Sequence, residues 1–492
     1  MKPEIDFLMI YPHRDLQAYS QRVLLGVLQD RGFSVHLLFV SGTEGIQKDD
    51  KIRDHFLRLI ERSKIIGFGF MSNGYPSAEY LTKLIKANFS KPVIWGGPHS
   101  TINYRNMSGH ADAIFVGEAE VVLQKYVEAT INNKDFSRLP QIVNGEDDFI
   151  PANKDFFIKE LDELPLPFYS NSDQSLITPD HFINSPDYFR SHFRDFHIMT
   201  SRGCPYSCSY CANSYLNNFI PDGIKHFRKR SEDYVIREIK HCQRAYSLSS
   251  IAIEDDLFLA RSNEELELFV ERYNKEINLP IGITGITPSF FHKDKIKIIS
   301  RLPLIHLRIG IQTLSAAGLE AYRRKTINKE LDNCIDHVKK LNKKGILFCY
   351  DVILDNPYES VRDNIKTLRY VSRLPKPFQL LLYHLTLYEG TELRNRAISD
   401  GFIDINDLAY IQRPYTQLNN TYINTLFRLI ESTYGLVPAG LIYLLSSPSV
   451  LNHECLQKPI KKVIDIAITL LNKISLQTYI WRYLGFKRRL YK

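Results

Sequence analysis

The stretch "TSRGCPYSCSYCANSY", residues 200–215, places three cysteines within eight positions of a 492-residue chain that has only seven. Disulfides are typical of small secreted scaffolds, and a structural zinc site needs a fourth ligand, usually in a second Cys-x2-Cys pair, which this sequence lacks. Three thiolates spaced C-x3-C-x2-C can hold three irons of a [4Fe-4S] cluster and leave the fourth iron open. The stretch therefore predicts an iron-sulfur site at Cys204, Cys208 and Cys211, with zinc or another cluster as the alternative. The scattered cysteines are expected to be buried small hydrophobes: Cys242, Cys334, Cys349 and Cys455.

The residues around these cysteines carry a family resemblance. Tyr210 precedes the third cysteine and "SRG" precedes the first, and together they resemble the radical S-adenosylmethionine (SAM) superfamily. The resemblance implies that the methionine part of SAM chelates the open iron, and that an electron from the cluster cleaves the sulfonium to release a 5′-deoxyadenosyl radical. A [4Fe-4S] cluster and SAM are therefore the expected cofactors.

Composition sets wider limits on the function. Hydrophobic residues make up 44% and charged residues 24% of the chain, which is ordinary for a protein of two or three domains. The net charge of +8 is modest for this length and the basic residues are dispersed, so nucleic acid is not an expected partner. The opening "MKPEIDFLMIYP" lacks the pattern of a signal peptide, and no uncharged segment is long enough to span a membrane. We expect a cytoplasmic location.

The first 135 residues alternate apolar runs with segments of helical spacing. The runs IDFLMIY, SVHLLFV, IIGFGFMS, PVIWGG and DAIFVGE are typical of buried parallel strands. The pattern predicts a doubly wound, Rossmann-like α/β domain over residues 1–135. Ligands of such sheets bind beyond the carboxyl ends of the strands, where this sequence places glycines that allow close backbone approach.

This half resembles the N-terminal cobalamin-binding domain of one large class of radical SAM enzymes. The resemblance implies that Ser72, Gly96 and Gly97 lie along the nucleotide tail of cobalamin. It also implies that Gly117 and Glu118 form the turn before the last helix of the domain. Cobalamin is therefore a third expected cofactor, and a degenerate domain kept for packing is the alternative.

One departure concerns the cobalt ligand. Cobalamin domains that supply a histidine to cobalt carry Asp-x-His-x-x-Gly after the first strand, where this chain reads "PHRDLQ" over residues 12–17. His13 is therefore expected to be a loop residue and not a cobalt ligand.

The remaining chain divides into three parts. Residues 136–195 are rich in proline, aspartate and serine and show no period, which predicts a linker or a segment lying over a neighbouring domain. Over residues 196–400, six apolar runs alternate with helices, as in the partial (β/α)6 TIM-type barrel of radical SAM enzymes. Residues 401–492 are expected to be mainly helical and to cap the barrel. The ending "LGFKRRLYK" leaves peripheral membrane contact open as an alternative.

Barrel active sites lie at the carboxyl ends of the strands. The superfamily places an acid after the second strand, where it pairs with the amino group of SAM, and this chain has Glu254, Asp255 and Asp256 there. Asp256 is preferred because it lies furthest along the strand, and Asp255 is second. A helix N-cap is the alternative role for one of these acids.

Other SAM residues are implied by the resemblance alone. Gln312 after the fourth strand would hydrogen-bond the ribose, Asp351 belongs to the fifth-strand segment, and Asn356 would approach the adenine. Lys325 has a lysine analogue in the family, although a surface lysine is an equal alternative. Glu389 replaces the proline of the usual Pro-Gly-Thr turn after the sixth strand.

Three functions follow from these observations. The first is a cobalamin-dependent radical SAM methyltransferase acting on an unactivated carbon. The second is a radical cyclase, oxidase or ring-rearranging enzyme, with or without cobalamin, and the third is a non-catalytic electron-transfer or sensor protein. A methylthiotransferase is disfavoured, because those enzymes place three further cysteines in the N-terminal domain, where this sequence has none. The expected partners are a small-molecule or lipid-like substrate and an electron donor such as flavodoxin or ferredoxin.

Overall fold

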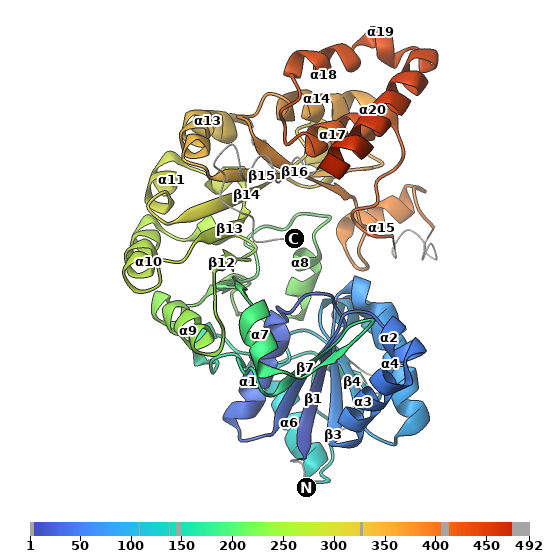
Figure 1. The fold of residues 1–492 in the computed structure, drawn as a ribbon, viewed down its shortest axis with the longest axis vertical. Helices are drawn as coiled ribbons and strands as arrows, with labels where there is room; N and C mark the ends of the chain where they lie inside the picture. The colour runs from blue at the N-terminus through green and yellow to red at the C-terminus, as the bar shows by residue number, and fades with distance from the viewer. Residues whose placement is uncertain are drawn as a thin grey trace. The chain divides into compact units, whose positions relative to one another are not determined.

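The computed structural model describes residues 4–107, 109–136, 138–143, 149–324, 328–404 and 413–474. The chain divides into two compact units, Met1–Pro205 with Ala212–Ser249 and Tyr206–Cys211 with Ser250–Lys492. Each unit contains parallel β-strands with helices packed against them (Figure 1).

The first unit holds an eight-stranded sheet in the order β6-β5-β4-β3-β1-β2-β7-β8. Its strands are β1 (Ile5–Tyr11), β2 (Val35–Val40), β3 (Ser63–Gly69), β4 (Val93–Gly96), β5 (Ala113–Phe115), β6 (Ile142–Val143), β7 (Gln174–Ile177) and β8 (Phe182–Ile183). All pairs are parallel except the two edge pairs, β5 with β6 and β7 with β8. The five strands expected from the sequence are present, which confirms the predicted α/β fold.

The sheet also takes in part of the segment expected to be a linker. Strand β7 begins with Gln174 and Ser175, and both are fully buried. Gln174 accepts a hydrogen bond from the Arg22 guanidinium and donates one to the Tyr246 hydroxyl. Because these buried positions are polar and the strand is short, it shows neither the apolar run nor the alternation that predicts a strand. The domain boundaries stay a prediction.

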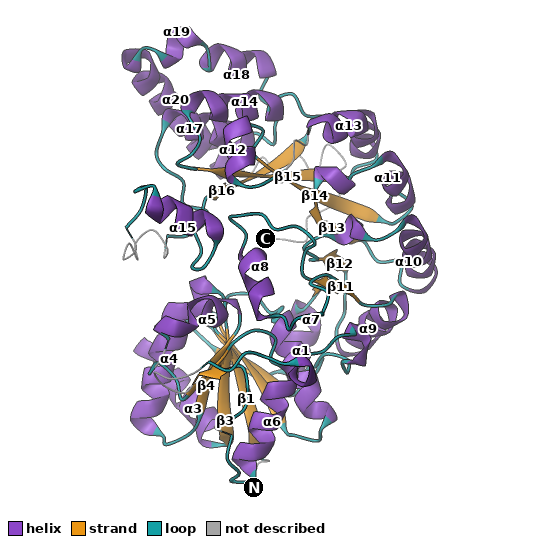
Figure 2. Ribbon diagram, turned by 180° about the vertical axis from the view of Figure 1, so that it is seen from behind, coloured by secondary structure: helices purple, strands orange, loops and turns teal. Residues whose placement is uncertain are grey.

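Helices cover both faces of this sheet (Figures 1 and 2). Helices α1 (Tyr19–Asp30) and α6 (Glu120–Ile131) lie on one face, and α3 (Asp50–Glu61) and α4 (Tyr75–Asn88) lie on the other. Phe56 of α3 and Leu81 of α4 pack with Ile10 and Phe68 of the strands in one buried cluster. The remaining helices of the unit are α2 (Glu44–Lys48), α5 (Pro98–Asn103), α7 (Pro186–His192), α8 (Ala212–Leu216) and α9 (Glu232–Ala245).

The second unit is built on five consecutive parallel strands. They are β12 (Ser250–Ile253), β13 (Ile281–Ile286), β14 (Leu304–Gln312), β15 (Leu347–Leu354) and β16 (Phe378–His384), and the order of this sheet ends with a sixth strand, β9 (Asp195–Ile198). The helices between them are α10 (Asn263–Glu276), α11 (Lys293–Ile299), α12 (Ala316–Ala321), α13 (Asn328–Lys343) and α14 (Val361–Val371), followed by α15 (Glu392–Ser399). This alternation is the expected partial (β/α) barrel.

The last described helices form a group beside β16 (Figure 1). They are α17 (Tyr422–Ser432), α18 (Ala439–Leu445), α19 (Pro448–Leu451) and α20 (Glu454–Ile474). Helix α17 contacts β16, α14 and α20. The basic ending at residues 484–492 and Lys325 both lie outside the described residues. Among the helices that are described, none combines the length and the apolar character needed to cross a membrane.

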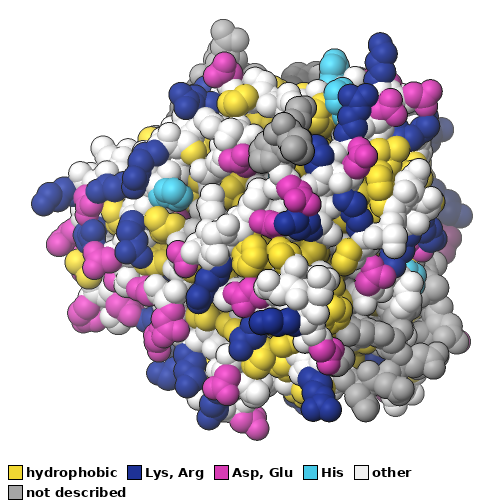
Figure 3. All heavy atoms as spheres, turned by 90° about the horizontal axis from the view of Figure 1, so that it is seen from below, with side chains coloured by type: hydrophobic (Ala, Val, Ile, Leu, Met, Phe, Trp, Pro, Cys, Tyr) yellow, Lys and Arg dark blue, Asp and Glu magenta, His cyan; other side chains and the backbone are white. Residues whose placement is uncertain are grey.

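All seven cysteines are thiols. Cys242, Cys334 and Cys349 are buried as expected, whereas Cys455 is exposed on α20, so the expectation for Cys455 was wrong. On the face drawn in Figure 3, basic and acidic side chains are interspersed, in keeping with the modest net charge.

Candidate functional site

The loop that carries the cysteines follows a short strand, β10 (Ser201–Arg202), and this strand pairs with β11 (Arg228–Lys229). Gly203 has a φ of +77°, and a Cβ there would lie 1.9 Å from the carbonyl oxygen of His226. Only glycine fits this turn, because any side chain would collide with the neighbouring backbone. The turn sets the direction of the chain one residue before Cys204.

The second half of the loop is fixed by backbone contacts inside the second unit. The Ser209 amide donates to the Tyr322 carbonyl at 3.2 Å, and the Ser209 hydroxyl donates to the Ala321 carbonyl at 2.5 Å. The Leu393 amide donates to the Ser209 carbonyl at 2.9 Å. Ser209 stands between Cys208 and Cys211, so these bonds hold that part of the loop in place.

A partly buried arginine accompanies this half of the loop. Arg324 donates to the Tyr210 hydroxyl at 3.2 Å and to the Gly310 carbonyl at 3.0 Å. Burial raises the pKa of the Cys208 thiol, and the positive charge of Arg324 works in the opposite direction. A fixed cation near a thiol favours the thiolate, which is the form that binds iron.

A polar cluster lies on the inner face of the strands. The Arg308 Nε donates to both carboxylate oxygens of Asp351, at 2.9 and 3.0 Å, and Arg308 Nη2 donates to the Tyr383 hydroxyl at 2.7 Å. Glu254 accepts a hydrogen bond from Thr284 at 3.2 Å, and burial raises the pKa of Glu254 to about 7. Asp351 lies in the middle of β15, and it accepts these hydrogen bonds from Arg308 of the neighbouring strand β14.

The acids that follow β12 differ in their surroundings. Asp255 is 2% exposed, and its carboxylate forms an ion pair with Arg261 at 3.1 Å. Asp256 is only partly buried. Asp255 pairs with Arg261, and Asp256, which is more exposed, stays the predicted partner of the SAM ammonium.

Gln312 ends β14 in an unusual backbone conformation. Its φ is +67°, and the pairing of β14 with β15 shifts register between Gly310 and Gln312. The side-chain Oε1 is buried without a hydrogen-bond partner in the described structure. A left-handed non-glycine residue costs of order 1–3 kcal/mol, and a buried unsatisfied oxygen adds to that cost. Such features are typical of ligand sites.

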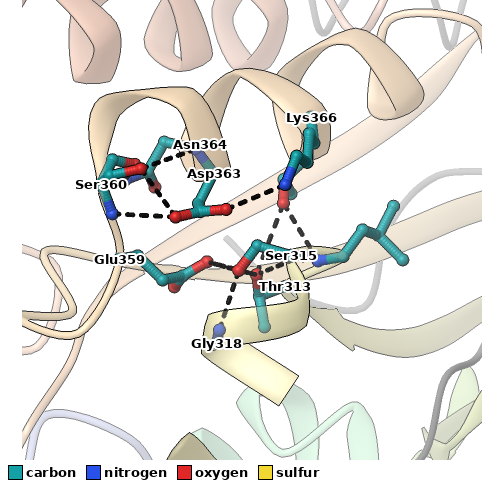
Figure 4. Close-up of polar contacts among 10 residues, drawn as sticks. Thr313, Ser315, Gly318, Glu359, Ser360, Asp363, Asn364 and Lys366 are labelled. Atoms are coloured by element: carbon teal, nitrogen blue, oxygen red, sulfur yellow. Dashed lines mark hydrogen bonds and ion pairs between the residues drawn. The ribbon is translucent and has the colours of Figure 1, made fainter. Parts of the chain in front are cut away.

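A hydrogen-bonded network joins the segments that follow β14 and β15 (Figure 4). Glu359 accepts from the Thr313 hydroxyl at 2.6 Å and from the Ser315 hydroxyl at 2.5 Å. Its other oxygen accepts from the Asn356 amide at 3.1 Å. Glu359 therefore holds Asn356 near the segment that begins with Gln312. Sequence analysis missed Glu359, whose only local signal is its place before the Ser360 cap of α14.

The strand ends of the first unit form a second candidate surface. Gly97 has a φ of +95°, and a Cβ there would lie 2.9 Å from the backbone of Phe70. A Cβ on Gly96 would meet only Phe115, at 3.6 Å, so the chain is open beside that residue. The Ser72 hydroxyl lies 2.9 Å from the Nδ1 of His99. These residues line up along one sheet edge.

Two histidines lie near this edge. Burial lowers the pKa of His99 to about 4, and its Nε2 is buried without a hydrogen-bond partner among the described residues. The His13 ring accepts a hydrogen bond from the Met71 amide at 3.4 Å, and burial lowers the pKa of His13. His99 could not be predicted from the sequence, because a single histidine after a strand matches no motif.

Glu118 has an additional role. Gly117 turns the chain with a φ of +84°, and Glu118 then forms ion pairs with Arg202, at 2.7 Å, and with Arg228. Glu120 pairs with the same Arg202 at 2.6 Å. This ion-pair cluster fixes β10, the strand that leads into Cys204.

Comparison with known proteins identifies the two folds. A model of the B12 binding domain matches residues 7–127, and a model of the radical SAM superfamily matches residues 198–371. The chain therefore carries a radical SAM domain and an N-terminal B12-binding domain. The cofactor set expected from the sequence, [4Fe-4S] cluster, SAM and cobalamin, is thereby confirmed.

Individual relatives of this radical SAM protein are distant. An uncharacterised methyltransferase of Pyrococcus horikoshii is 24% identical over 363 residues, 72% of this chain and 73% of the relative. The anaerobic magnesium-protoporphyrin IX monomethyl ester cyclase of Rubrivivax gelatinosus is 23% identical over 64% of this chain and 55% of its own length. The radical SAM methyltransferase TsrM of Kitasatospora setae, solved with tryptophan and a SAM analogue, is 16% identical with a TM-score of 0.62, over 80% of this chain and 76% of TsrM.

The residues of this radical SAM protein fit the expected cofactors in their chemistry. No three Cys, His, Asp or Glu side chains within the described ranges are grouped closely enough to hold a metal ion, so the fit of the cluster depends on the donor set. That set is three partly exposed thiols on one anchored loop, as an iron-sulfur cluster requires. For SAM, the fit depends on the unsatisfied Gln312 oxygen, and for cobalamin it depends on the glycine-lined sheet edge with His99.

Proposed function

We propose that this protein is a cobalamin-dependent radical SAM methyltransferase that modifies an unactivated carbon of a small molecule. The observation that supports the proposal is the conformation of Gln312. Its backbone is strained and its side-chain oxygen is buried without a partner, at the strand end where a radical SAM barrel binds its cofactor. The ligand that Gln312 would bind is the SAM ribose, since a hydroxyl can satisfy the amide oxygen.

The barrel residues divide the binding of the cofactors among them. Cys204, Cys208 and Cys211 would each give a thiolate to one iron, and Asp256 would pair with the SAM ammonium. Asn356, held by Glu359, would approach the adenine. When bound, the cluster supplies the electron for SAM cleavage and cobalamin supplies methyl-transfer chemistry. Asp351 would act through Arg308, because it already binds that guanidinium at two points.

The first unit would hold cobalamin along its sheet edge. Ser72, Gly96 and Gly97 would border the nucleotide tail, and Gly117 allows the turn beside it. Glu118 would have an indirect role, because its two ion pairs tie this turn to the strand before the cluster loop.

The ligand set is tested with protein purified and reconstituted without oxygen. The triple Cys204→Ala, Cys208→Ala, Cys211→Ala variant should lose its iron and its charge-transfer absorbance, whereas Cys455→Ala, an exposed control, should keep both. A full cluster in the triple variant would remove the central assignment.

The reaction type is tested by the fate of SAM. A methyltransferase of this type should form S-adenosylhomocysteine as well as 5′-deoxyadenosine, measured by mass spectrometry with reductant, cobalamin and a metabolite extract. A radical cyclase or oxidase is the second candidate, favoured by the similarity to the Rubrivivax cyclase. Formation of 5′-deoxyadenosine alone would favour this second candidate.

An electron donor such as flavodoxin or ferredoxin belongs to the same proposal, because the cluster must be reduced before each SAM cleavage. A lipid-like substrate remains a variant of the proposal. A cytoplasmic location also stays a prediction, consistent with seven cysteines that are all thiols.

A further inference from the structure

A pocket of about 460 Å³ lies between β16 and α17, within the second unit. Tyr383 and Leu381 of β16, Tyr415, and Arg428 and Glu431 of α17 are among its lining residues. The volume is in the range of small-molecule sites in proteins, about 300–1,000 Å³. None of the residues assigned to SAM, the cluster or cobalamin lines this pocket.

Glu431 is an anomaly within it. Glu431 is partly buried, and its carboxylate makes no hydrogen bond within the described residues; burial raises its pKa, and the charge of Arg428 works in the opposite direction. It also stands in the last turn of α17 (Tyr422–Ser432), where the helix dipole disfavours a negative charge. A partly buried carboxylate in a pocket wall that has no hydrogen-bond partner is available to a cationic group of a ligand.

Arg428 supplies the opposite charge at the same pocket. It lies one turn before Glu431 on the same helix, and its side chain is exposed. Residues three apart on a helix are neighbours with about 5–6 Å between Cβ atoms, so the charged groups of Arg428 and Glu431 lie on the same side of α17, where both line the pocket. The two side chains therefore present a cation and an anion side by side to one ligand.

The other walls are aromatic and apolar. The rings of Tyr383 and Tyr415 lie 5.7 Å apart between centroids at 39° to one another, and Leu381 adds apolar surface. Tyrosine faces attract ammonium groups and also pack against apolar groups. The Tyr383 hydroxyl is bound by Arg308, so the pocket adjoins the polar cluster inside the barrel.

We propose that this pocket binds a small zwitterion with an apolar or aromatic body, its ammonium on Glu431 and its carboxylate on Arg428. An α-amino acid is the simplest molecule of this class. That this ligand is the substrate rests on the proposed function, because Tyr383 is the penultimate residue of β16, at the end of the barrel where SAM is expected.

The test is binding, measured by calorimetry or saturation-transfer NMR on anaerobically reconstituted protein. Three probes of similar size separate the charges: L-phenylalanine carries both, 2-phenylethylamine only the ammonium and 3-phenylpropanoate only the carboxylate. Wild type should bind phenylalanine about tenfold more tightly than either single-charge probe, because each charged hydrogen bond contributes on that scale. Glu431→Gln should remove the advantage of phenylalanine over 3-phenylpropanoate. Arg428→Gln should remove its advantage over 2-phenylethylamine.

The control is Glu454→Gln, which neutralises an exposed carboxylate on α20 and should leave all three affinities unchanged. Equal binding of the three probes by wild type, no binding of any of them, or an unchanged phenylalanine preference in Glu431→Gln would each overturn the proposal. Because no turnover is measured, such a failure leaves the methyl-transfer proposal standing. Conversely, absence of SAM cleavage would leave the binding result valid.

Discussion

The Glu431 carboxyl should make the folded protein less stable as the pH rises. Burial raises its pKa from 4.5 to about 7. Below pH 4.5 the carboxyl is protonated in both the folded and the unfolded chain, and it has no effect on the free energy of unfolding. Between pH 4.5 and 7 the unfolded chain releases the proton more readily, so stability falls as pH rises. Above pH 7 the cost is complete.

The size of the cost follows from the pKa. Each pKa unit corresponds to about 1.4 kcal/mol, so ionised Glu431 costs the folded state about 3 kcal/mol above pH 7. Glu431→Gln keeps the shape of the side chain and removes the charge. The variant should therefore be more stable than wild type by up to about this amount at pH 8, with a much smaller gain at pH 5.

The assay is denaturant unfolding of wild type and variant at pH 5, 6, 7 and 8, followed by circular dichroism. The difference between the two proteins isolates this carboxyl, since all other titrating groups are shared. Glu454→Gln serves as the matched control and should show no such trend. A gain in stability that is the same at every pH, or a variant that is less stable than wild type at pH 8, would contradict the predicted cost of ionising Glu431.

Four other substitutions test the site assignments. Asp256→Asn should weaken SAM binding, measured by calorimetry, by about 1–3 kcal/mol while the cluster stays intact. Asp255→Asn should mainly lower the stability of the fold, because it breaks the buried ion pair with Arg261. Equal SAM affinity in wild type and Asp256→Asn would exclude Asp256 from the site. Arg202→Gln should destabilise the protein by about 3 kcal/mol in denaturant unfolding, because Glu118 and Glu120 lose a shared partner; a loss below about 1 kcal/mol would contradict this. His13→Ala should leave the spectrum of bound cobalamin unchanged, and a spectral shift would show that His13 reaches cobalt.

Local sequence patterns were sufficient for the strands and for the cysteine loop. The run IDFLMIY became β1 with the expected bounds, and the run LIHLRIGIQTLS, residues 304–315, contains β14, which ends at Gln312. Both are long apolar runs whose burial dictates a strand. Strand β7 was missed, because its first two buried positions are polar and hydrogen-bonded.

The pairings between distant side chains could not be predicted. Asp351 stays a predicted SAM residue, and its hydrogen bonds from Arg308 of the neighbouring strand had no signal in the sequence. Glu118 stays a predicted cobalamin residue, and its ion pairs with arginines of β10 and β11 had no signal either. Such pairs depend on strand order and register, and neither is written in the local period of the sequence.

Burial of a charge alone does not distinguish a structural carboxylate from a ligand-binding one. Glu238 is fully buried, but it accepts hydrogen bonds from the hydroxyls of Tyr169 and Tyr19 and pairs with Arg230. Those partners offset part of the desolvation cost of the Glu238 carboxylate, so its ionised form is stabilised without a ligand. Glu431 is partly buried, its carboxylate makes no hydrogen bond within the described residues, and it lines a pocket. Glu431 is a stronger candidate than Glu238 for contact with a ligand, because its carboxylate has no hydrogen-bond partner among the described residues and lines a pocket.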